Sequence, residues 1–137
     1  MKNREVFDRD PVTTPLANNG QARITDKLEE KEVAELRSEL STFVCEGQYE
    51  EGIRRIIESF LGSLNNTNQP AAWVSGFFGS GKSHLLKMLC HLWANTTFDS
   101  DGATARSLVP KMPHEVQAVL KELDTRGRQS GGLHAAS

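Results

Sequence analysis

Residues 76–83 read Gly-Phe-Phe-Gly-Ser-Gly-Lys-Ser and fit G-x-x-x-x-G-K-[ST], the Walker A phosphate-binding pattern, at every specified position. Its glycines allow the backbone to curl so that several N–H groups converge on one anion. Lys82 adds a positive charge that can reach the β- and γ-phosphates of a nucleotide. The pattern therefore predicts a phosphate site whose binding residues are Gly76, Gly79, Ser80, Gly81, Lys82 and Ser83.

The last residue of the pattern, Ser83, predicts a metal ion beside the nucleotide. A serine hydroxyl is a hard oxygen ligand, and Mg²⁺ prefers such ligands together with phosphate oxygens. We also expect Ser83 to open a helix, so that the positive end of the helix dipole faces the phosphates. The predicted cofactors are ATP and Mg²⁺, although no base-reading motif in the sequence separates ATP from GTP.

A Walker A loop needs a strand before it and a helix after it. Residues 71–75, Ala-Ala-Trp-Val-Ser, form a short apolar run between Pro70 and Gly76, which predicts a buried strand. Apolar residues after the loop recur at helical spacing, at Leu85, Leu86, Met88, Leu89, Leu92 and Trp93. The order predicts an α/β fold with an incomplete P-loop NTPase core of strand, loop and helix.

The part of the chain before this core is predicted to be helical. Prolines, asparagines and a glycine interrupt residues 1–25, which we interpret as an N-terminal arm. Apolar residues then recur every three or four positions over about 27–44, and again between Tyr49 and Leu64. Residues 26–69 are thus expected to form an α-helical hairpin, and a last helix is expected over about 114–125.

A complete P-loop ATPase also needs an acidic residue at the end of a second core strand, where it completes the Mg²⁺ site. No apolar strand ending in Asp or Glu follows Ser83; the nearest candidate, residues 118–124, has helical spacing. One strand cannot make a parallel sheet. We therefore interpret residues 70–137 as the start of a P-loop NTPase domain, truncated before its Walker B strand, with no catalytic residue of its own.

Composition narrows the choice of partner. A net charge of −2 and a pI near 6.1 do not favour nucleic acid. Residues 26–51 carry nine acidic against three basic side chains, which predicts a solvated helix face or an acidic docking surface. The sequence contains neither a membrane-length apolar run nor a signal-peptide core, so a cytoplasmic location is expected.

Around the loop, the longer stretch Trp-Val-Ser-Gly-Phe-Phe-Gly-Ser-Gly-Lys-Ser-His-Leu at 73–85 resembles the P-loop protein of BREX-type (phage growth limitation) bacterial defence systems, the family called BrxC or PglY. Other similar segments are residues 4–7, 10–11, 43–49, 101–106 and 127–136. Members of that family are very large cytoplasmic proteins, and the chain is similar to their first part. The resemblance implies ATP binding on the residues of the Walker A loop, ATP hydrolysis by the full-length protein, and other defence-system subunits as partners.

Two functions of other classes remain open at this point. A small-molecule or nucleotide kinase would use the same loop to hold a phosphoryl donor, and would need an acceptor pocket and an arginine-rich lid. A docking module without catalysis would use the acidic helices to bind a partner, and nucleotide would only stabilise its fold. Charge reversal at Glu29, Glu32 and Glu35 that abolishes partner binding but leaves nucleotide binding intact would favour the docking module.

Overall fold

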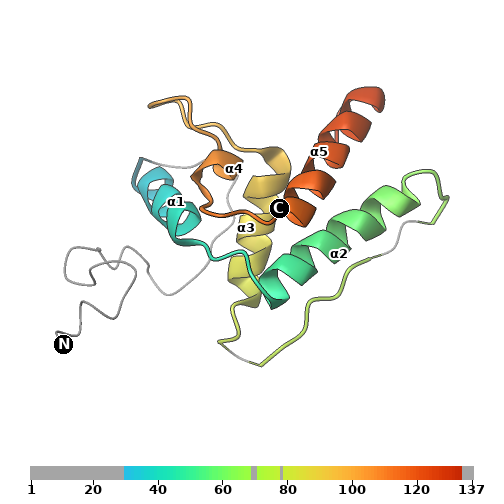
Figure 1. Ribbon diagram of the computed structural model, residues 1–137, viewed down its shortest axis with the longest axis horizontal. Helices are drawn as coiled ribbons and strands as arrows, with labels where there is room; N and C mark the ends of the chain where they lie inside the picture. The colour runs from blue at the N-terminus through green and yellow to red at the C-terminus, as the bar shows by residue number, and fades with distance from the viewer. Residues whose placement is uncertain (1–29, 69–70, 78, 134–137) are drawn as a thin grey trace.

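The computed structural model describes residues 30–68, 71–77 and 79–133. Their regular structure is helical, and Figure 1 shows how the helices are arranged. The helices are α1 (Glu30–Thr42), α2 (Gln48–Ser63), α3 (Lys82–Ala94), the short α4 (Ala105–Leu108) and α5 (His114–Gln129). The expected arm at residues 1–25 lies outside the described residues.

Helix α3 is the centre of the molecule. It packs against α2, α4 and α5, while α2 also packs along α5 and α1 along α4 (Figure 1). One continuous apolar core fills the space between them; its fully buried members include Leu36, Leu40, Ile53, Ile57, Met88, Leu92 and Val116. Burial of such side chains supplies most of the stability of a helical domain of this size, because short isolated helices are marginal in water.

The sequence around α3 explains where this helix begins and ends. Gly81, just before it, has a left-handed backbone with φ of 80°, which favours glycine. Asn95, just after it, is also left-handed, and its N–H donates to the carbonyl of His91. Between these ends the predicted apolar face is confirmed at four positions, since Leu85, Met88, Leu89 and Leu92 are buried.

The two helices expected before the loop are present, but their packing differs from a hairpin. A turn at Gly47, with φ of 58°, separates α1 from α2. Helix α2 then packs chiefly against α5, and α1 chiefly against α4. The apolar stripes of α1 and α2 therefore face later parts of the chain, which spacing within residues 26–69 does not reveal.

A tight connection between α3 and α5 is the least expected part of the fold. An isolated antiparallel bridge joins Thr97 to Thr104, and Thr104 caps α4 by exchanging hydrogen bonds with Ser107. The Arg106 guanidinium donates to the α3 carbonyls of Leu92, at 2.7 Å, and Trp93, at 3.1 Å. The same group pairs with Asp124 of α5, which ties α3, α4 and α5 together.

The predicted α/β fold is wrong for the part of the chain that the structure describes. Residues 71–75 form no strand; they follow an irregular path beneath α2 toward α3 (Figure 1). Trp73, expected in a buried strand, is 91% exposed, and only Val74 packs partly against the core. A strand needs a neighbour for its backbone N–H and C=O groups, and the described residues offer only the isolated bridge far from this segment.

A membrane span was not expected, and among the described helices none combines the length and the apolar character needed to cross a bilayer. The longest, α2 and α5, have 16 residues each. In both helices the buried apolar residues face the core, and charged residues lie on the rest of the helix surface.

Candidate functional site

The glycine loop contains two residues with a left-handed backbone. Gly79 and Gly81 both have φ of 80°, a conformation that residues with a β-carbon rarely adopt. The N–H of Ser80 donates to the carbonyl of Phe77 at 3.1 Å, which closes a tight turn between them. A β-carbon at Gly76 would lie 2.7 Å from the Ser80 hydroxyl oxygen, so a larger residue there would require the Ser80 side chain to move.

Lys82, the first residue of α3, folds its side chain back over this turn. Its ammonium donates to the carbonyl oxygens of Gly76, at 2.9 Å, and Phe77, at 2.7 Å, and approaches the Ser80 hydroxyl at 3.2 Å. An ammonium has three N–H donors, so these loop oxygens occupy all of them. The contacts lie on the exposed side of the loop. A phosphate group could therefore replace them without opening the core.

Ser83 lies on the exposed first turn of α3, next to Lys82. Its hydroxyl suits Mg²⁺ chemically, but one hydroxyl cannot hold the ion by itself. Among residues 30–68, 71–77 and 79–133, no group of three His, Cys, Asp or Glu side chains is close enough to bind a metal. A Mg²⁺ ion at Ser83 would thus take most of its ligands from phosphate oxygens and water.

Four of the six predicted residues line a groove of about 610 Å³ between the loop and α2, namely Gly76, Ser80, Gly81 and Lys82. Gly79 and Ser83 are not among its lining residues. One wall of the groove is formed by residues 72–77 and the start of α3. The opposite wall is the first two turns of α2, through Gln48, Tyr49, Gly52, Arg55 and Ile56. The walls bring together segments that are about thirty positions apart in the sequence, and the motif itself marks only one of them.

Tyr49 is the residue of the α2 wall that sequence reasoning missed as a site residue. Its apolar spacing predicts only a packing role. In the structure its hydroxyl lies against the α-carbon of Gly81, where a β-carbon would collide with it. Arg55, one and a half turns further along α2, is exposed and forms an ion pair with Glu51 at 3.3 Å. No signal in the sequence pairs either side chain with the loop.

Polar groups beneath the loop are buried rather than open to the groove. Lys87 of α3 pairs with Glu39 of α1, with 2.6 Å between Nζ and Oε2, and each side chain is 10% exposed or less. His84 and His91 lie one turn on either side of Lys87 on α3. Burial lowers the pKa of both imidazoles, and the nearby positive charge of Lys87 lowers it further. Glu39 is thus an exception to the solvated acidic face expected over residues 26–51.

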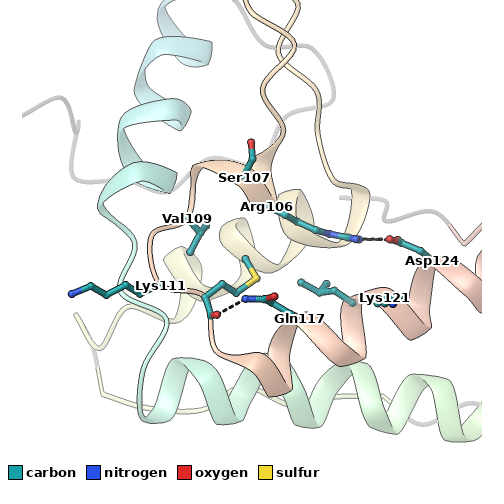
Figure 2. Close-up of a pocket in the computed structure, with 9 residues that line it drawn as sticks. Arg106, Ser107, Val109, Lys111, Gln117, Lys121 and Asp124 are labelled. Atoms are coloured by element: carbon teal, nitrogen blue, oxygen red, sulfur yellow. Dashed lines mark hydrogen bonds and ion pairs between the residues drawn. The ribbon is translucent and has the colours of Figure 1, made fainter.

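A second cavity of about 530 Å³ lies between α4 and α5 (Figure 2). Its most polar residue is Arg106, whose guanidinium already donates to Asp124 at 2.6 and 2.9 Å and to two α3 carbonyls. The Gln117 amide donates to the Met112 carbonyl at 2.7 Å. Figure 2 marks this hydrogen bond of Gln117 with a dashed line. Arg106 and Gln117 therefore already have partners within the protein, and we regard the loop groove as the better candidate for a ligand.

No protein-family model and no solved structure matches this chain.

Proposed function

We propose that residues 76–83 bind the triphosphate of a nucleotide, with ATP and Mg²⁺ as the ligands. The observation that supports this most is the placement of Lys82 and the left-handed Gly81 at the start of α3, on the border of a groove, with the left-handed Gly79 two residues before Gly81. The amino end of a helix favours anions through its free N–H groups and its dipole. Phosphate oxygens would take over the donors of Lys82 from the loop carbonyls, and Ser83 would contribute its hydroxyl to Mg²⁺.

The wider role is part of the same proposal. The chain would be the ATP-binding part of a large cytoplasmic ATPase that acts with other subunits of a BREX-type anti-phage defence system. This role rests on the resemblance of residues 73–85 and the other matching segments. ATP hydrolysis would require acidic and arginine residues of the full-length protein, whereas this segment would bind nucleotide.

Titration calorimetry with Mg²⁺-ATP tests the binding step. Wild type should bind, and Lys82→Ala should weaken binding by roughly 100-fold, since about 3 kcal/mol of charge-assisted contacts is lost. Lys31→Ala is a matched control, because Lys31 is an exposed lysine on α1 and does not line the groove. Wild-type affinity in the Lys82→Ala variant, or equal weakening in both variants, would contradict the proposal.

The metal and the base are tested by two further titrations. Ser83→Ala should weaken binding of Mg²⁺-ATP but not binding of ATP in excess EDTA, since only the metal ligand is removed. Equal affinity for ATP and GTP would keep the phosphate assignment and overturn the preference for adenine. An equal effect of Ser83→Ala with and without Mg²⁺ would remove the metal from the proposal.

A further inference from the structure

The Tyr49 side chain brings α2 into contact with the glycine loop at Gly81. Its hydroxyl lies in the space that a side chain at Gly81 would otherwise take. Gly81 immediately precedes α3, and its carbonyl accepts the N–H of Leu85 at 2.9 Å. The phenol oxygen is therefore placed beside the first turn of α3, where free backbone N–H groups favour an anion.

Aromatic neighbours hold Tyr49 in this position. Its ring meets Phe43 edge to face, with centroids 5.5 Å apart and an interplanar angle of 75°. It also meets His84 of α3 at 6.4 Å and 89°, and His84 in turn contacts Phe43 at 5.7 Å. Such pairs restrict ring orientation as well as contributing to packing. Phe43 and His84 contact the ring of Tyr49, whereas its hydroxyl lies against the loop at Gly81.

The groove places this hydroxyl close to the proposed ligand. Tyr49, Gly81 and Lys82 all line the same groove, so a phosphate group on Lys82 would come near the phenol. A tyrosine hydroxyl can donate its O–H to an oxygen acceptor. A hydrogen bond from such a donor to a charged phosphate oxygen is short and strong, because the acceptor is ionised.

We propose that the Tyr49 hydroxyl donates a hydrogen bond to a phosphate oxygen of the nucleotide bound at residues 76–83. Tyr49 would be a binding residue that the Walker A pattern does not include, supplied by α2. This inference rests on the proposed function of the loop. It also assigns the α2 wall a role in recognition: the wall would read the phosphate chain rather than the base.

The test uses Tyr49→Phe, which removes the hydroxyl and keeps the ring contacts with Phe43 and His84. Affinity should fall about tenfold for Mg²⁺-ATP and by the same factor for Mg²⁺-tripolyphosphate, which has no base. The urea midpoint should equal that of wild type, because the aromatic packing is kept. Unchanged affinity, or a loss for ATP that tripolyphosphate does not share, would overturn the inference.

The sequence offers a direct spectroscopic readout, since it contains a single tyrosine. With tyrosine labelled by ¹³C at its ζ carbon, one NMR signal reports the phenol. Addition of Mg²⁺-tripolyphosphate should shift this signal in wild type, and should leave it unshifted in Lys82→Ala. A signal that does not move while wild type binds tripolyphosphate would overturn the inference alone. Failure of wild type to bind any of these ligands would instead overturn the proposed function.

Discussion

Two lysines on α3, Lys82 and Lys87, have opposite environments although five positions separate them. Lys82 lies at the exposed start of the helix, and its ammonium contacts oxygens of the glycine loop. Lys87 is 6% exposed and its ammonium contacts Glu39 of α1. The same chemical group therefore has an exchangeable set of partners at one position and a fixed, desolvated partner at the other.

This difference separates the part of α3 that we propose binds a ligand from the part that holds the fold. The contacts of Lys82 can pass to phosphate oxygens at little cost, because solvent reaches the loop. The Glu39–Lys87 pair cannot be broken so cheaply, since either charge left alone inside the core would lose its hydration without compensation. We therefore expect substitutions at the two lysines to affect different properties.

The largest effect is expected for Lys87→Met. The variant leaves the Glu39 carboxylate buried without its partner, which should lower the free energy of unfolding by about 3–5 kcal/mol. Urea unfolding followed by circular dichroism measures this. The control is the double variant Glu39→Met with Lys87→Met, in which no charge is left buried and most of the stability should return. A double variant as unstable as Lys87→Met would contradict the account.

The two tryptophans extend the comparison from charge to packing. Trp93 packs on Phe60 with ring centroids 4.7 Å apart, and its indole N–H donates to the Leu133 carbonyl at 3.3 Å. Trp93→Ala should cost about 2–3 kcal/mol of stability, less than a fully buried tryptophan, because its side chain is only partly covered. Trp73→Ala should change stability by less than about 0.5 kcal/mol, since Trp73 is 91% exposed. Similar losses in urea unfolding of the two variants would contradict the exposed placement of residues 71–77.

A smaller effect is expected from pH, through the buried face of α3. The pKa of His84 and of His91 is lowered in the folded protein, chiefly by burial, with Lys87 adding to the shift and Glu39 opposing it. As pH falls below about 6.5, the unfolded chain takes up protons that the folded protein does not. The free energy of unfolding should therefore be highest above about pH 6.5 and fall as the solution is acidified.

Urea midpoints between about pH 5 and pH 7.5 measure this dependence. His91→Gln should reduce the slope, because one of the two buried imidazoles is removed while Glu39 and Lys87 remain. The window lies well above the pKa of Asp101, which its Arg37 partner lowers to about 2. Stability that rises on acidification in wild type would contradict the burial of these histidines.

The sequence predicts local features of this molecule better than its overall class. Glycine at positions 79 and 81 follows from a loop that needs positive φ, and both are found there. The apolar spacing of residues 85–92 and 116–123 predicts helices, and α3 and α5 include these stretches. In each case the cause is contained in a few neighbouring residues, so no knowledge of distant segments is needed.

Features that depend on distant segments could not be predicted in this way. The run at 71–75 looks like a strand, but a strand exists only with a partner, and no partner is found among the described residues. The pairing of Arg106 with Asp124 and of Glu39 with Lys87 depends on how α1, α3, α4 and α5 meet. Tyr49 likewise joins the loop only because α2 passes beside it, which leaves no trace in the motif.

The most direct test of the distinction between a ligand-binding Lys82 and a structural Lys87 is ligand-dependent stability. It compares the urea unfolding of wild type and Lys82→Ala with and without Mg²⁺-ATP. Without nucleotide, the two proteins should unfold at nearly the same midpoint, since Lys82 is not part of the core. At a nucleotide concentration of about 100 times the wild-type Kd, wild type should gain about 2.7 kcal/mol and Lys82→Ala only about 0.4 kcal/mol. Equal stabilisation of both proteins, or of neither, would contradict the assignment of the glycine loop as a nucleotide site.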